Sequence, residues 1–182
     1  MCYGRPVDFT RALEQVATFL DAHGHRWAVV GGLAMQAYGF SRTTQDVDLV
    51  VEATAKNAIV SFMESLGYET LHASGGFSNH VHTDQRLGRV DFVYIDAPTA
   101  DRIFAASRRV AGIHGRALVV PTPEHLIAMK VHAAKNDPSR ALREMADVEY
   151  LLRQPGVEPQ AVRRYFEAAG LLRWYDELTR KA

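Results

Sequence analysis

The sequence predicts an α+β (α/β) protein in which a small mixed β-sheet is flanked by helices and followed by a C-terminal helical extension. Two observations predict this fold class. Apolar strand-like runs alternate with amphipathic helical stretches up to residue 121, and only helical patterns follow from Thr122 onward. We therefore expect a mixed core over residues 1–121 and a helical segment over residues 122–182 that packs on this core.

The elements of the core are recognised by the spacing of their apolar residues. Helical spacing follows Asp8, which suits an N-cap, whereas short apolar runs bounded by glycine have strand character. The expected elements are a helix at 8–22, a strand at 26–32, a short helix at 33–38, a strand at 46–52, a helix at 54–66, a hairpin within 68–84, a strand at 88–96, a helix at about 99–109 and a strand at 116–121.

The helical segment begins where Thr122 can act as an N-cap and Pro123 can occupy the first helical position. A second helix is expected from Ser139 to about Leu152. After a loop at 154–159, two short helices complete the chain.

The composition excludes several classes of protein. Lys and Arg together number 21, as do Asp and Glu, so no net charge draws the chain to anionic lipid or, by a mild argument, to RNA. Cys2 is the only cysteine, which excludes a disulfide framework and a thiolate metal cluster. Neither a signal-peptide pattern nor an apolar run of membrane-spanning length is present, so we expect a cytoplasmic protein without a membrane partner.

Two aspartates interrupt the apolar strand at 46–52. Alternate strand residues share a face, so Asp46 and Asp48 point the same way at a separation of roughly 7 Å. Two like charges this close raise each other's pKa unless a cation lies between them. Oxygen ligands favour Mg²⁺ or Mn²⁺ over zinc. The pattern therefore predicts a divalent metal site.

A third aspartate, Asp91, interrupts the apolar strand at 88–96 in the same way. If this strand pairs beside 46–52, the three carboxylates form one cluster that can bridge two hard cations, as in-line phosphoryl displacement requires. Gly31 and Gly32 end a strand and precede a helix, where backbone N–H groups can face a bound phosphate without obstruction from side chains.

This ordered set resembles the nucleotidyltransferase superfamily related to DNA polymerase β. The superfamily signature matches Val30-Gly31-Gly32 and Asp46-Val47-Asp48-Leu49, with Asp91 as the third carboxylate. The resemblance implies a minimal nucleotidyltransferase fold. Within the superfamily, the sequence looks most like the abortive-infection, type IV toxin-like nucleotidyltransferases, whose Arg-x-Thr-x-Asp-x-Asp pattern is matched by Arg42, Thr44, Asp46 and Asp48.

These relatives also carry a lysine on a downstream helix and an R-x-K-D-L-A-D segment. Lys130 fits the lysine, and residues 141–147 fit the segment in part. Asp147 matches its last aspartate, which makes it an accessory site residue. Glu144, Arg143 and Ala141 depart from the pattern.

The resemblance implies a nucleotidyltransferase that moves a nucleoside monophosphate from an NTP, such as ATP, to an acceptor hydroxyl with two Mg²⁺ (or Mn²⁺) ions. Asp46 and Asp48 would bind both ions, and Asp91 would bind the ion that activates the hydroxyl. Gly31, Gly32, Arg42 and Lys130 would neutralise phosphate charge, and Thr44 would be a further nucleotide-binding residue. The acceptor could be an RNA end, a protein or a small molecule, and a role in a toxin–antitoxin pair is open.

Other interpretations remain open at this stage. The chain could be a catalytically silent nucleotide-fold module that binds a partner protein, or a zinc hydrolase that uses His80, His82 and Asp91. At single positions, Arg42 could form a structural bridge with Asp46, Lys130 could be a solvated surface residue, and Asp147 could pair with Arg143.

Overall fold

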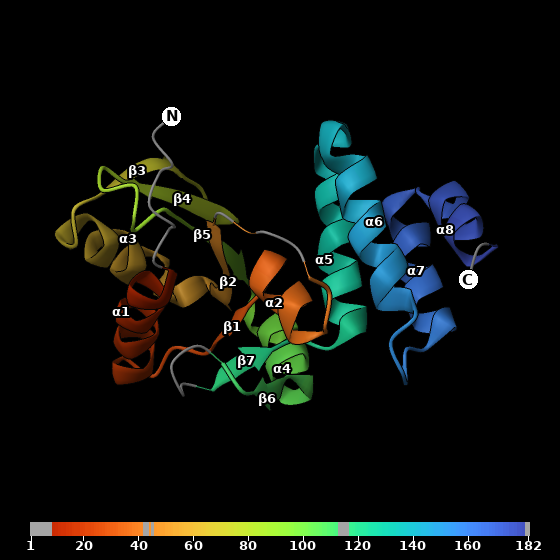
Figure 1. Cartoon of the computed structure of the whole chain (residues 1–182), viewed down its shortest axis with the longest axis horizontal. Helices are drawn as coiled ribbons and strands as arrows, with labels where there is room; N and C mark the ends of the chain where they lie inside the picture. Colours follow the sequence, from red (N-terminus) through yellow and green to blue (C-terminus); the bar gives the residue numbers. More distant parts are fainter. Residues whose placement is uncertain (1–8, 42–43, 45, 113–116, 181–182) are drawn as a thin grey trace. The chain divides into compact units, whose positions relative to one another are not determined.

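The computed structural model describes residues 9–41, 44, 46–112 and 117–180, and Figure 1 shows the course of the chain. The chain divides into two compact units, Met1–Pro121 and Thr122–Ala182. The first unit contains the sheets and the second is helical. Arg42, one of the predicted phosphate ligands, lies outside the described residues.

Within the described residues, five strands form one sheet in the order β1-β2-β5-β4-β3. At its centre β2 (Asp46–Glu52) and β5 (Arg89–Ile95) run parallel, and the remaining pairings are antiparallel. The other strands are β1 (Trp27–Val29), β3 (Tyr68–Ala73) and β4 (Phe77–His82). The structure confirms the mixed α/β fold class and the small mixed sheet that the sequence predicts.

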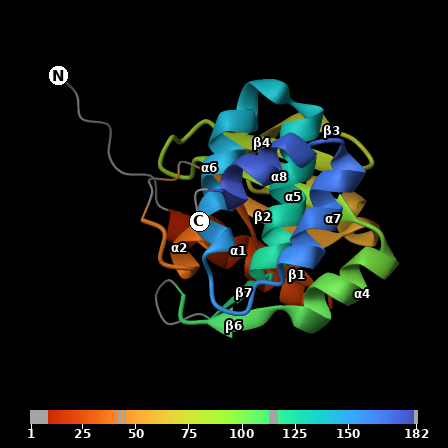
Figure 2. The same cartoon turned by 90° about the vertical axis from the view of Figure 1, so that its right-hand side faces the viewer.

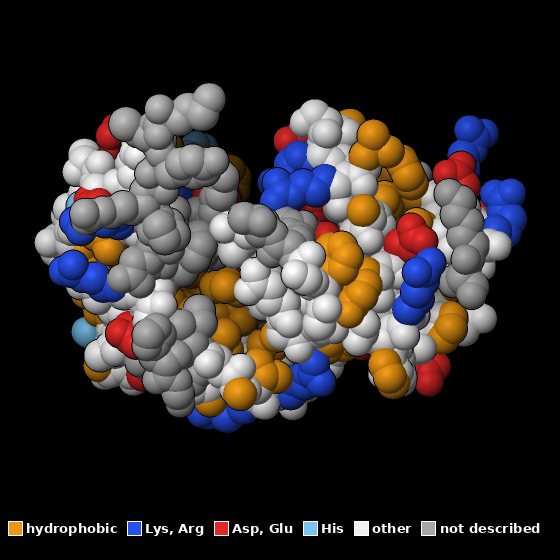
Figure 3. All heavy atoms as spheres, viewed as in Figure 1, with side chains coloured by type: hydrophobic (Ala, Val, Ile, Leu, Met, Phe, Trp, Pro, Cys, Tyr) orange, Lys and Arg blue, Asp and Glu red, His pale blue; other side chains and the backbone are white. Residues whose placement is uncertain are grey.

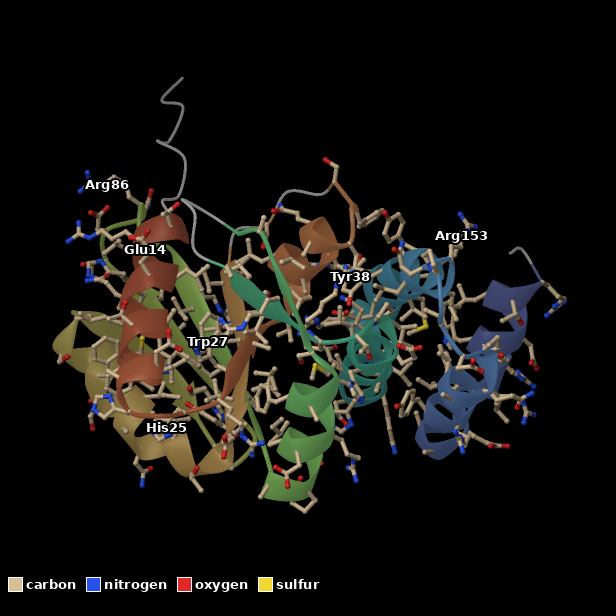
Figure 4. The ribbon with its side chains drawn as sticks, turned by 90° about the horizontal axis from the view of Figure 1, so that it is seen from below. Glu14, His25, Trp27, Tyr38, Arg86 and Arg153 are labelled. Atoms are coloured by element: carbon tan, nitrogen blue, oxygen red, sulfur yellow. The ribbon has the colours of Figure 1, made fainter. Side chains whose placement is uncertain are left out.

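One face of this sheet forms the core of the first unit. Helices α1 (Phe9–Ala22) and α3 (Lys56–Ser65) cover it side by side, with the rings of Phe19 and Phe62 stacked at a centroid distance of 4.0 Å (Figure 1). Trp27 points from β1 toward α1 and donates its indole N–H to Asp21 at 2.8 Å (Figure 4). The buried residues that β2 and β5 present to this face are Val47, Leu49, Val51, Val90, Phe92 and Tyr94, and Val50 of β2 is buried on the opposite face.

A polar network lies within this core face. Ser78 and His80 are fully buried, and the Ser78 hydroxyl is 2.8 Å from His80 Nε2 and 2.7 Å from the Tyr94 hydroxyl. Burial lowers the pKa of His80, which favours the neutral imidazole. Asp91 lies on the opposite face of the sheet, because it alternates with core residues along β5. The zinc-hydrolase alternative, which groups His80 with Asp91, is therefore wrong.

The paired glycines lie in a helix and not at the end of a strand. The strand expected at 26–32 is shortened to β1, and α2 (Gly31–Ala37) begins at Gly31 after Val30. Gly31 has a left-handed φ of +56°. This backbone conformation permits an abrupt change from strand to helix, and few residues other than glycine adopt it.

The helix expected at 99–109 ends early. It is α4 (Ala97–Ala106), and the Asp96 side chain caps it by accepting a hydrogen bond from Thr99 N at 2.9 Å. Residues Arg108–Val110 instead form β6, which pairs with β7 (Leu118–Val120) in a separate small sheet. Residues 108–110 therefore pair with β7 as a strand, although their local sequence pattern predicts a helix.

The second unit consists of α5 (Pro123–Asn136), α6 (Ala141–Leu152), α7 (Pro159–Ala169) and α8 (Leu172–Thr179). Figure 2 shows α5 beside α6 and α7. The Thr122 hydroxyl accepts a hydrogen bond from His125 N, which confirms the predicted N-cap. Among the described residues, no helix is both long and apolar enough to cross a membrane. The buried apolar residues of this unit are Leu126, Ile127, Val131, Ala134, Met145, Val148, Leu151, Val162, Phe166 and Leu178.

Candidate active site

The aspartates of β2 and β5 meet on the face of the sheet opposite the core. Asp48 and Asp91 are direct partners in the parallel pairing, and Asp46 is opposite Arg89. Partners on neighbouring strands share a face, so the three carboxylates lie on the same side of the sheet. Each of these aspartates is partly buried. The structure thus brings together the acidic residues that the sequence singles out.

Gly31 makes room for one of these carboxylates. A Cβ atom built on Gly31 would lie 1.9 Å from Asp48 Oδ2, 2.6 Å from Asp48 Cγ and 2.9 Å from Asp48 Cβ. No rotation of the Asp48 side chain removes its own Cβ from this contact. The first turn of α2 therefore packs directly on Asp48, and only glycine fits at position 31.

Gly32 makes room for the residues that precede β2. A Cβ atom on Gly32 would lie 2.5 Å from Thr44 Cβ and 2.6 Å from Thr44 Oγ1. Thr44 in turn donates its hydroxyl to the carbonyl oxygen of Asp46 at 3.0 Å. The two glycines thus allow α2 to pack closely against the start of β2. Their predicted contact with phosphate, and that of Thr44, stay predictions.

Arg89 belongs to the same cluster and was missed by sequence reasoning. Its Nε donates to Asp91 Oδ1 at 2.7 Å. The pKa of Arg89 is raised, first by this hydrogen bond and further by the charges of Asp91, Asp46 and Asp48, against an opposing effect of burial. The available signal was its position two residues before Asp91, which places both side chains on one face of a strand.

The donor set fits a hard divalent cation, although the side chains are not arranged around one. Asp46, Asp48 and Asp91 offer carboxylate oxygens only, which is the ligand type that Mg²⁺ and Mn²⁺ prefer. Within the described residues, no group of three or more His, Cys, Asp or Glu side chains is positioned to hold a metal ion. One of the two carboxylate oxygens of Asp91, Oδ1, accepts a hydrogen bond from Arg89.

Lys130 and Asp147, the site residues predicted in the second unit, contact each other. The Lys130 ammonium lies 2.5 Å from Asp147 Oδ2 and 3.1 Å from Glu144 Oε2, and all three side chains are buried. Arg140 reaches the other oxygen of Glu144 at 2.9 Å. Lys130 is therefore not a solvated surface residue. Its role toward a nucleotide, and the accessory role of Asp147, stay predictions.

Charged side chains of both signs are interspersed over the face of the molecule drawn in Figure 3. This agrees with the zero net charge of the sequence. Among the side chains coloured on this face, neither unit by itself shows a continuous basic surface of the kind that follows a nucleic acid backbone.

Solved structures that resemble this chain include nucleotidyltransferases. The solution structure of the antibiotic-resistance factor ANT(2″)-Ia aligns with a TM-score of 0.67 and 15% identity, covering 96% of this chain and 98% of that chain. Lincomycin-bound LnuA, a lincosamide antibiotic adenylyltransferase, aligns with a TM-score of 0.54 and 14% identity, covering 82% and 99%. A putative nucleotidyltransferase from Thermotoga maritima, TM1012, aligns with a TM-score of 0.53 and 13% identity, covering 76% and 92%. At such identities the likeness establishes the fold class.

The sequence gives a closer assignment. Residues 4–180 match the model of the family described as "Uncharacterised nucleotidyltransferase", and the chain belongs to this family. The predicted resemblance to nucleotidyltransferases is thereby confirmed, whereas the toxin-like branch stays a prediction. No curated protein matches the chain.

Proposed function

We propose that the protein transfers a nucleoside monophosphate from an NTP to a hydroxyl group of a small molecule, with divalent metal ions held by Asp46, Asp48 and Asp91. The observation that carries this proposal is the pairing of Asp48 with Asp91 beside Gly31. Membership of a nucleotidyltransferase family supplies the reaction class.

The carboxylates and the backbone divide the work of the reaction. Asp46 and Asp48 would hold the ions that carry the triphosphate, and Gly31 and Gly32 would bring backbone N–H groups to the phosphates. The bound ions would supply charge stabilisation and lower the pKa of the acceptor hydroxyl. The acceptor oxygen forms a bond to the α-phosphorus, the bond from that phosphorus to the bridging oxygen breaks, and pyrophosphate leaves. Asp91 would accept the hydroxyl proton.

Three observations favour a small-molecule acceptor. One neighbour, ANT(2″)-Ia, is known in complex with adenylyl-2″-tobramycin, and LnuA is known with lincomycin bound. This chain covers 97% and 99% of the lengths of these neighbours, so a fold of this size suffices for a small acceptor. The zero net charge of the chain gives no general attraction to RNA.

The test is a labelling experiment. The protein is incubated with each α-labelled NTP, Mg²⁺ and a cell lysate, with tobramycin and lincomycin as defined acceptors in parallel, and the RNA, protein and small-molecule fractions are separated. Label should enter the small-molecule fraction, and EDTA or Asp48→Asn should abolish it. The matched control is Asp176→Asn, which removes an exposed carboxylate from α8. Label confined to RNA or protein would overturn the acceptor class, and label that survives Asp48→Asn would overturn the site.

One observation favours a second function, a catalytically silent module that binds a partner protein. Arg89 already neutralises Asp91, as a structural ion pair would. The same labelling experiment separates the two functions, because a silent module transfers no label with any NTP. A role as a toxin belongs to the enzymatic proposal and predicts that overproduction slows growth in the wild type but not in Asp48→Asn.

A further inference from the structure

Arg89 lies beside the proposed metal ligands but has no role in the proposed reaction. It lies on the carboxylate face of β5, opposite Asp46 and two residues from Asp91. Its guanidinium therefore shares this face with three carboxyl groups, and its Nε donates directly to Asp91 Oδ1 at 2.7 Å. The side chain is 41% exposed, whereas that of Asp91 is 20% exposed.

A guanidinium and a divalent ion have opposite requirements at this cluster. Both neutralise carboxylates, so either one relieves the repulsion between the aspartates. An ion that binds Asp91 through Oδ1 competes with Arg89 for this oxygen, and an ion bound through Oδ2 still lies next to the guanidinium. Two cations this close repel each other. Because much of the Arg89 side chain is exposed, it can turn into solvent without breaking the packing of the sheet.

We propose that Arg89 is a built-in counter-ion that holds Asp91 in the metal-free protein and is displaced when a divalent ion binds. This inference rests on the proposed function, since it assumes that the cluster is a metal site. It makes Arg89 a positioning residue. Its presence keeps the acidic cluster together without metal and weakens the binding of the first ion.

The experiment measures Mn²⁺ binding to the nucleotide-free protein by electron paramagnetic resonance of the free ion. Arg89→Gln removes the competing charge and should bind Mn²⁺ about tenfold more tightly than the wild type at low salt, because one unit charge within a few ångströms of the ion is lost. Arg89→Lys keeps the charge and should bind about as weakly as the wild type. Thermal unfolding in EDTA confirms that each variant is folded.

The matched control is Arg86→Gln. Arg86 carries the same charge and lies three residues away in sequence, but it pairs with Asp84 in the exposed turn that precedes β5 (Figure 4). Its loss changes the net charge equally and should alter the Mn²⁺ affinity less than about twofold, since exposed charges are screened.

The outcomes distinguish this inference from the proposed function. Tighter Mn²⁺ binding in Arg89→Gln, but not in Arg86→Gln or Arg89→Lys, supports the counter-ion. If the wild type binds Mn²⁺ and Asp48→Asn does not, but Arg89→Gln binds no more tightly than the wild type, the inference fails and the metal site stands. If neither the wild type nor any variant binds Mn²⁺, the proposed metal-dependent function fails and the counter-ion role fails with it.

Discussion

Replacing Gly31 with alanine tests whether α2 packs directly on Asp48, one of the proposed metal ligands. The new methyl group meets Asp48 at three atoms, the nearest at 1.9 Å, and the residue must also keep a φ of +56°. The left-handed conformation costs a non-glycine residue roughly 1–2 kcal/mol. Overpacking of this kind costs about 1–3 kcal/mol more. We therefore expect Gly31→Ala to lose about 2–5 kcal/mol of unfolding free energy.

The assay is thermal and urea unfolding followed by circular dichroism. For a protein of this size, such a loss lowers the Tm by roughly 5–15 °C. Gly75→Ala is the control, because a Cβ atom there meets nothing within 4 Å and its φ is not left-handed. The control should melt within about 2 °C of the wild type. A double-mutant cycle with Asp48→Ala should recover about 1 kcal/mol or more, since the Oδ2 and Cγ contacts disappear. A Gly31→Ala protein that melts like the wild type would refute the packing argument.

Three further changes test other parts of the structure. Asp48→Asn should abolish nucleotide transfer while the Tm stays equal or rises, because one of three clustered like charges is removed; loss of folding would make Asp48 structural. Lys130→Met should cost about 3–5 kcal/mol in urea unfolding, because it removes the buried cation that contacts the carboxylates of Glu144 and Asp147, although Glu144 keeps its contact with Arg140. Burial lowers the pKa of His80 in the folded state, so the unfolded chain takes up the proton first as the pH falls. The stability contributed by neutral His80 should therefore be present above about pH 6.5 and be lost below it. Measurement of the Tm from pH 8 to pH 5 tests this prediction.

Each of the two stability predictions has a control. Lys135→Met removes an exposed lysine from the last turn of the same helix and should change the unfolding free energy by less than about 0.5 kcal/mol. His80→Gln should flatten the pH dependence of the Tm below pH 6.5, whereas His72→Gln, at an exposed position, should leave it as in the wild type. If the Tm depends on pH with the same slope in the wild type and in both variants, His80 is not the source of the pH dependence.

The sequence was sufficient for those features that depend on local patterns. Alternation along a strand placed Asp46 with Asp48 and separated both from Val47 and Leu49, and this is how the chain folds. The N-cap at Thr122 followed from the same kind of local chemistry. The prediction that Asp91 lies beside Asp48 depended on the pairing of strand 88–96 with strand 46–52, because a local pattern does not determine which strands pair.

The features that sequence reasoning missed depend on contacts between distant segments. The contact of Gly31 with Asp48 exists only when α2 folds back on β2. Arg89 is distinguished from an ordinary strand residue only when β5 pairs with β2 and places it on the same face as Asp46, Asp48 and Asp91. Likewise, the early end of α4 follows from the pairing of β6 with β7, and the burial of Lys130 follows from the packing of α5 on α6. Each of these depends on tertiary structure that periodicity does not encode.

The parallel pairing of β2 with β5 also determines when the site can form as the chain folds. Between these strands the chain passes through α3, β3 and β4, so their pairing closes a long loop at an entropic cost before any contact is gained. The last aspartate therefore joins its partners late, and the unfolded polypeptide offers no cluster to a divalent ion. If Asp46, Asp48 and Asp91 bind magnesium as proposed, the ion should slow unfolding and leave the refolding rate unchanged, because it binds the folded sheet and not the unfolded chain.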